Sequence, residues 1–195
     1  MHNEAQKEFW NGSAGDVWVE AQGVMDYMLA PLSDAAIAAA APQSNEKIID
    51  VGCGCGATTL AIAESGASVW GVDISEPMVA RARDRAVDLD NISFSVADAS
   101  LVKYAPEHHL IFSRFGVMFF DDPEAAFSNL RSALVQGGRL TFVCWQSPKQ
   151  NPFMSVAGKA VRRYMPESEQ RDPREPGPFA FADRSWIIEI LGRAG

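Results

Sequence analysis

The chain has 195 residues and a formal net charge of −8, and 47% of its residues are hydrophobic. This length and composition predict one globular domain with a full-sized core and argue against intrinsic disorder. A negative charge without long runs of Lys or Arg disfavours nucleic acid and anionic membranes as partners.

Three further features favour a cytoplasmic protein. No apolar stretch approaches the roughly 20 residues that span a bilayer, and the N-terminal sequence lacks the pattern of a secretory signal. The three cysteines, Cys53, Cys55 and Cys144, are too sparse for a disulfide framework and fit a reducing compartment. Cys53 and Cys55 are also too close together for a metal-binding Cys-x-x-Cys pair, so no metal site is expected.

Residues 1–46 are predicted to form a helical lid segment. Hydrophobic residues follow a broken helical periodicity around Gly12 and Gly15, and Pro31 is expected to begin a new helix that ends before Pro42. From Lys47 the pattern changes, and residues 47–195 are predicted to form the main domain.

In this main domain, short β-like runs alternate with amphipathic segments. The β-like runs cover residues 47–52, 68–74, 92–98, 109–115 and 139–145. Several contain consecutive apolar residues, which is typical of strands covered on both faces. One helix is predicted after Ser75 as its N-cap, and another from Pro123 through Leu134 to Gly137–Gly138. Only the link at 99–108 is too short for a full helix.

This alternation predicts an α/β fold with an open, doubly wound sheet of mostly parallel strands and right-handed crossovers. A turn-rich insert, roughly residues 146–183, follows the fifth predicted strand and is expected to form a cap. A last apolar helix covers residues 186–194.

The loop after the first predicted strand carries the clearest functional signal. Gly52, Gly54 and Gly56 alternate there, so the backbone can turn sharply and a ligand can lie directly against it. In an open parallel sheet, ligands bind beyond the carboxyl ends of the strands, where this loop lies. Asp73 ends the second strand, 21 positions after Gly52, and can accept both hydroxyl hydrogens of a ribose.

The glycine spacing alone fits two classes of cofactor. Gly52-x-Gly54-x-x-Ala57 also satisfies the relaxed dinucleotide fingerprint. However, Asp50, Asp73 and Asp98 gather negative charge that repels two phosphates and tolerates a sulfonium and an α-amino group. A cationic nucleoside cofactor is therefore favoured. A nicotinamide-dependent reductase and a cofactor-binding protein without turnover stay open as alternatives.

Several motifs resemble the class I S-adenosylmethionine-dependent methyltransferases, particularly small-molecule members similar to the quinone-biosynthesis type. They are I-I-D-V-G-C-G-C-G (48–56), G-V-D-I-S-E-P-M (71–78), V-A-D-A (96–99), F-S-R-F-G-V-M-F-F (112–120), L-V-Q-G-G-R-L-T-F-V-C-W (134–145) and F-W-N-G-S-A-G-D-V-W (9–18). The resemblance implies S-adenosyl-L-methionine as cofactor, methyl transfer to a small-molecule acceptor, and a Rossmann-like sheet of strand order 3-2-1-4-5.

The resemblance also implies which residues hold the cofactor. They come from five segments and are Trp18, Asp50, Gly52, Cys53, Gly54, Asp73, Ile74, Met78, Asp98, Ala99, Ser113 and Arg114. Asp73 would hold the ribose, Asp98 would meet the adenine amino edge, and Trp18 would close over the ligand. Ser113 and Arg114 would supply a backbone carbonyl beside the sulfonium. Structural alternatives stay open: Asp50 could hold the loop in shape, and Trp18 could anchor the core.

No catalytic residue is predicted, because the cofactor brings the reactive group. His108 and His109 precede the fourth strand, at the opposite edge of the sheet, and are expected at the surface. Members of the family normally add two strands after the final helix, which this chain lacks. The fifth strand, Leu140–Trp145, would then be an exposed apolar edge. A homodimer contact through this edge, or the insert, is expected to cover it.

Overall fold

The computed structural model of the protein describes residues 3–161 and 172–195 and confirms the predicted α/β fold. One sheet contains the strands β1 (Lys47–Val51), β2 (Ser68–Asp73), β3 (Ile92–Val96), β4 (His108–Arg114) and β5 (Leu134–Val143). Every strand pair is parallel, and the spatial order is β3-β2-β1-β4-β5, as predicted. The described residues contain no sixth or seventh strand.

Helices precede, connect and follow these strands. Before the sheet come α1 (Glu4–Asn11), α2 (Ser13–Glu20) and α3 (Gln22–Ala40), and the crossovers use α4 (Ala57–Ala63), α5 (Glu76–Arg85) and α6 (Pro123–Ser132). A 3-10 turn, η1, covers Val117–Phe119, and α7 (Pro152–Val161) and α8 (Arg184–Ala194) follow β5. The link between β3 and β4 contains no helix, as expected from its length.

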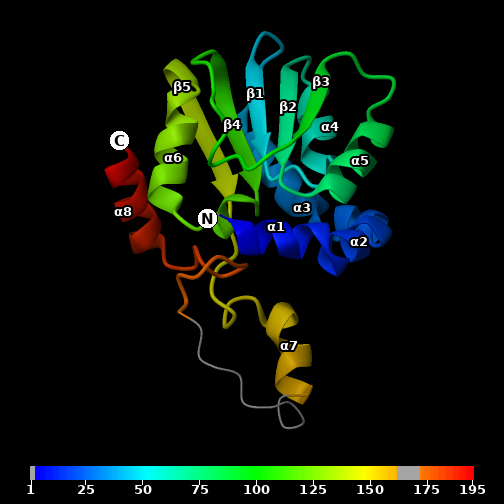
Figure 1. Ribbon diagram of the computed structural model, residues 1–195, viewed down its shortest axis with the longest axis vertical. Coiled ribbons are helices and arrows are strands. Elements are labelled where there is room, and N and C mark those ends of the chain that lie inside the picture. The colour runs from blue at the N-terminus through cyan, green and yellow to red at the C-terminus, as the bar shows by residue number, and fades with distance from the viewer. Residues whose placement is uncertain (1–2, 162–171) are drawn as a thin grey trace.

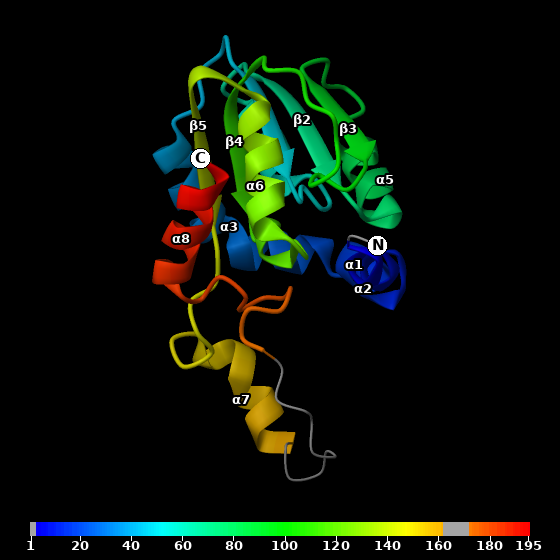
Figure 2. The same cartoon turned by 60° about the vertical axis from the view of Figure 1, so that its left-hand side comes forward.

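The sheet separates two hydrophobic cores, and the alternation of side chains along β1 shows how. Ile48 packs with residues of α3 and α4, whereas Ile49 packs with residues of α6 and α8. Both isoleucines are fully buried, because successive residues of a strand point to opposite faces and helices cover both. Figures 1 and 2 show this layered arrangement.

The N-terminal helices lie across the carboxyl ends of the strands, at the ends marked by the arrowheads (Figure 1). The predicted break at Pro31 is wrong, because Pro31 lies inside the continuous helix α3. A proline inside a helix removes one backbone hydrogen bond. Here the packing of Leu29, Ser33 and Ala36, all buried, offsets that loss.

The predicted end of the helix after Pro123 is also wrong. Helix α6 ends at Ser132, and Leu134 already belongs to β5, where it pairs with His108. Five residues of β5 then correspond to two of β4, since the next pair is Leu110 with Arg139. The turn at Gly137, with φ of 81°, absorbs this irregularity, so the two glycines shape the strand instead of ending the helix.

Two smaller expectations about individual side chains are corrected as well. Ser75 occupies the N-cap position of α5, but its hydroxyl donates to the carbonyl of Trp10 at 2.7 Å instead of capping the helix. His108 is buried, not at the surface, because it lies within β4 and beside Trp70. Burial lowers the pKa of His108.

The predicted insert at 146–183 contains α7, and its residues 162–171 lie outside the described part of the chain. Within the described residues, β5 pairs with β4 alone and is therefore an edge strand. Its side chains are half-buried against both cores. None of the described helices combines the length and apolar character required to cross a membrane.

Candidate cofactor and acceptor site

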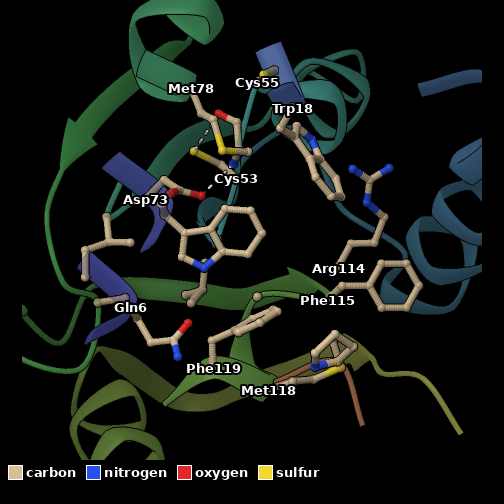
Figure 3. A pocket seen from close by; sticks show the side chains of 18 of the residues that line it. Gln6, Trp18, Cys53, Cys55, Asp73, Met78, Arg114, Phe115, Met118 and Phe119 are labelled. Atoms are coloured by element: carbon tan, nitrogen blue, oxygen red, sulfur yellow. Dashed lines mark hydrogen bonds between the residues drawn. The ribbon is translucent and has the colours of Figure 1, made fainter. Parts of the chain in front are cut away.

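A cavity of about 290 Å³ lies where the carboxyl ends of β1, β2 and β4 meet the N-terminal helices. Its floor comes from the loops that follow these strands, and α1, α2 and α3 contribute its roof. Figure 3 shows Asp73 and Cys53 on one side and Arg114 and Phe115 on the other, with Trp18 above them. The volume is at the lower end of the range for small-molecule sites, about 300–1,000 Å³.

The glycine loop brings bare backbone to the cavity wall. Gly52 has φ of 70° and lies back to back with Gly116, so that a Cβ on Gly52 would stand 2.6 Å from the Cα of Gly116. The amide of Gly52 donates to the carbonyl of Val72 at 2.8 Å, which ties the loop to β2. A side chain at position 52 is therefore excluded by both backbone conformation and space.

Asp73 closes the loop from the end of β2. Its two carboxylate oxygens accept hydrogen bonds from the amides of Gly54 at 2.8 Å and Ser75 at 2.9 Å. Desolvation raises the pKa of Asp73, and the backbone hydrogen bonds oppose that rise. Each oxygen keeps a free lone pair, so the carboxylate can still receive hydroxyl hydrogens from the cavity.

Ten of the twelve predicted cofactor residues line this cavity together. They are Trp18, Gly52, Cys53, Gly54, Asp73, Ile74, Met78, Asp98, Ala99 and Arg114. The sequence thus predicted which segments meet at one place, although they span nearly a hundred residues of chain.

The other two predicted residues, Asp50 and Ser113, lie behind the loop and do not line the cavity. Asp50 is fully buried and accepts hydrogen bonds from the hydroxyls of Thr58 at 2.7 Å and Thr59 at 2.6 Å. Desolvation raises the pKa of Asp50. The hydroxyl of Ser113 donates to the carbonyl of Val51 at 2.8 Å. Both side chains hold the first turn of α4 and the loop in place.

The N-terminal arm supplies lining residues that the sequence analysis did not single out. Asn3 donates its amide to both oxygens of Asp98, at 3.0 and 2.9 Å, and is joined to Asp121 by two further hydrogen bonds of 2.6 and 2.8 Å. Gln6 also lines the cavity. No local pattern identifies Asn3, because its partners lie 95 and 118 positions away.

Aromatic rings from the roof and the floor of the cavity contact one another. The ring of Trp10 contacts Trp18 edge to face at 5.9 Å and Phe119 at 5.4 Å between centroids. All three residues line the cavity and are half-buried. Trp18 therefore packs against Trp10 and also forms part of the cavity wall.

The described lining contains no histidine. His109 accepts a hydrogen bond from the amide of Lys47 at 3.1 Å, at the amino end of β1 and away from the cavity. The thiol of Cys53 is buried in the wall, and burial raises its pKa, so it remains protonated. These side chains offer neither a general base nor a thiolate nucleophile.

Comparisons with known proteins agree with this arrangement. Residues 48–138 match the family described as "Methyltransferase domain". Aklanonic acid methyltransferase DauC of Streptomyces sp. is 35% identical over 107 residues, which are 52% of this chain and 49% of that protein. The demethylmenaquinone methyltransferase of Corynebacterium kroppenstedtii is 26% identical over 79% of this chain and 69% of its own length.

A solved structure shares the fold over nearly the whole chain. Phosphoethanolamine N-methyltransferase 2 of Haemonchus contortus, in complex with S-adenosyl-L-methionine, superimposes with a TM-score of 0.71. It is 20% identical and covers 97% of this chain, but 44% of its own. This chain also spans about half the length of DauC. The family match over residues 48–138, the relatives and the strand order thus make this chain similar to the S-adenosylmethionine-dependent methyltransferases.

Proposed function

We propose that the protein transfers a methyl group from S-adenosyl-L-methionine to a small-molecule acceptor. The observation that carries this proposal is the cavity in which the bare backbone of Gly52 and Gly54 lies beside the carboxylates of Asp73 and Asp98. The relatives named as methyltransferases support the reaction type.

The described residues fit this cofactor better than a dinucleotide. Asp73 has free lone pairs for the two ribose hydroxyls, and Asp98 lies at the end of β3, where the adenine amino group would be received. Two carboxylates in the wall and a third, Asp50, behind it would repel a pyrophosphate. A nicotinamide-dependent reductase is therefore the weaker candidate.

The bound cofactor supplies an activated methyl group on a sulfonium. The protein's own contribution is then to position the acceptor within roughly 3–3.5 Å of that group and to exclude water. The rings of Trp10, Trp18 and Phe119 provide apolar surface in the cavity wall for this purpose. The described wall contains no histidine, and its carboxylates Asp73 and Asp98 are assigned to the cofactor, so the acceptor should arrive ionised or carry a nucleophile that needs no deprotonation.

The N-terminal segment is proposed to act as the lid over this site. Asn3 at one end of α1 binds Asp98 and Asp121, and Asn11 at the other end binds the backbone of Ile74 and Glu76 at 2.9 and 2.8 Å. Helix α1 thus bridges two strand ends and is fastened on both sides. The hydrogen bonds to these four partners lie outside the sheet, so α1 can detach from them while the sheet stays folded, as a lid requires.

The direct test is a transfer assay. The protein is incubated with methyl-labelled S-adenosyl-L-methionine and a small-molecule extract, and methylated products are identified by mass spectrometry. The proposal predicts a labelled product together with S-adenosylhomocysteine. Cofactor binding without any labelled product would support the second candidate, a cofactor-binding protein without turnover.

The partners and the location that we propose rest on the edge of the sheet, the net charge and the cysteines. The β5 edge, which pairs with β4 alone in the described chain, is the proposed homodimer contact unless the 146–183 insert covers it. The net charge of −8 disfavours nucleic acid as a partner. The three free cysteines suit the reducing cytoplasm. Light scattering of the protein in solution tests the homodimer.

A further inference from the structure

Arg114, at the carboxyl end of β4, is a cation without a paired carboxylate in the described structure. One terminal nitrogen, Nη1, donates to the hydroxyl of Ser33 at 2.9 Å, and Nε is buried without a hydrogen-bond partner among the described residues. No described carboxylate lies within ion-pairing distance of its guanidinium. Arg114 is half-buried, and a partly desolvated charge without a partner is unfavourable, so a missing counter-charge is expected.

The two acids near Arg114 do not form an ion pair with it. Asp26 receives Arg85 at 2.8 Å and Gln22 at 2.6 Å. Asp50 receives the hydroxyls of Thr58 and Thr59 on Oδ2, and its Oδ1 has no partner among the described residues. Burial lowers the pKa of Arg114, and the charges of Asp50 and Asp26 only partly oppose this effect. The protein itself therefore leaves this guanidinium available to a ligand.

Apolar residues line the cavity beside Arg114, and Figure 3 shows Phe115 next to Arg114 on the side away from Asp73. The ring of Phe115 stacks on Trp145 with centroids 4.1 Å apart and an interplanar angle of 4°. Trp145 in turn meets Phe153 edge to face at 5.7 Å. All three aromatic residues line the cavity, together with Met25 and Met28 of α3.

The backbone of Phe115 shows that this wall is held in place by the fold. Its φ of 63° is in the left-handed region, which is strained for a bulky residue. Such strain persists only where the surroundings impose it, and it concentrates at ligand sites. Here it turns the Phe115 ring toward Trp145 directly after Arg114.

We infer that Arg114 binds an anionic oxygen of the methyl acceptor, a carboxylate or phenolate on an aromatic ring that lies along Phe115 and Trp145. This inference rests on the proposed methyl transfer. It places the cofactor at the Asp73 and Asp98 end of the cavity and the acceptor at the Arg114 end. A guanidinium keeps the acceptor oxygen ionised, which agrees with the absence of histidine from the described wall.

Binding of a matched pair of probes tests the inference. We use 2-naphthoate and its neutral analogue 2-naphthamide, titrated by calorimetry with and without saturating S-adenosylhomocysteine. The intact protein should bind the anion at least ten-fold more tightly than the amide. Arg114→Gln should abolish this preference and change the affinity for S-adenosylhomocysteine less than three-fold. Arg114→Lys should keep part of the preference.

A matched control is Arg131→Gln, on the exposed face of α6 away from the cavity, which should retain the full preference. Equal affinity of the intact protein for both probes, or no binding of either, would overturn the inference. A ten-fold or larger loss of S-adenosylhomocysteine binding in Arg114→Gln would overturn it too, because the guanidinium would then serve the cofactor's own carboxylate. Failure of the intact protein to bind S-adenosylhomocysteine would instead reject the proposed function. The probe titration in the absence of S-adenosylhomocysteine would still test the role of Arg114.

Discussion

Charged side chains form ion pairs at the amino end of the sheet, whereas two charged groups at its carboxyl end have atoms without partners. At the amino end, Arg139 forms two hydrogen bonds of 2.6 and 2.8 Å with the carboxylate of Glu46, and Lys47 pairs with Glu107 at 2.6 Å. At the carboxyl end, Oδ1 of Asp50 and Nε of Arg114 are buried without partners among the described residues.

Backbone strain does not separate the two ends in this way. Gly52 and Phe115, both with positive φ, lie at the carboxyl end, but Ala41 and Gly137, also with positive φ, lie at the amino end. The unpartnered atoms of Asp50 and Arg114 are therefore the feature that marks the carboxyl end. An unpaired charge costs stability, so we expect it to persist where a ligand can make use of it.

The largest effect should come from filling the space between Gly52 and Gly116. Gly52→Ala should lower the free energy of unfolding by about 2–4 kcal/mol, because the new Cβ meets immovable backbone in addition to the strain of positive φ. Urea denaturation measures the change. Gly137→Ala is the matched control, since Gly137 has φ of 81° but nothing within 4 Å of its Cβ position; it should cost about 1 kcal/mol. Equal losses would show that the close approach has no energetic importance.

A comparable test at the amino end removes the partner of Glu46. Arg139→Met should cost roughly 2 kcal/mol of stability, because the Glu46 carboxylate, 8% exposed, is left without its guanidinium. The same change at the exposed Lys47–Glu107 pair, Lys47→Met, should cost at most about 1 kcal/mol. Affinity for S-adenosylhomocysteine should stay unchanged in both variants. A loss of affinity would contradict the separation of the two ends.

The smallest expected effect is a change in the pH dependence of stability. Burial raises the pKa of Asp50 in the folded protein, so the unfolded chain ionises first as pH rises. This carboxyl therefore reduces stability between the ordinary aspartate pKa of about 3.9 and its raised folded value. The free energy of unfolding of Asp50→Asn minus that of the intact protein should therefore rise with pH across that interval. Above the interval this difference should stay constant. A difference that falls as pH rises would show that Asp50 is stabilised as an anion by its two threonines.

The sequence predicted the features that depend on local pattern. Consecutive apolar residues in β1 and the glycines after it indicated a covered parallel strand and its ligand loop, and both are confirmed. Contacts between distant segments could not be predicted in this way. Asn3 meets Asp98 only because α1 folds back over the sheet, and the φ of Phe115 follows from packing against Trp145. Leu134 was misassigned because an apolar residue fits the end of a helix and the start of a strand equally well.

The measurement that tests the central claim most directly is calorimetric titration with S-adenosylhomocysteine and, separately, with NADH. We predict one-to-one binding of S-adenosylhomocysteine, no competition from NADH, and a loss of about 1–3 kcal/mol of binding free energy in Asp73→Ala. Binding of NADH in place of S-adenosylhomocysteine, or an unchanged affinity in Asp73→Ala, would contradict the account.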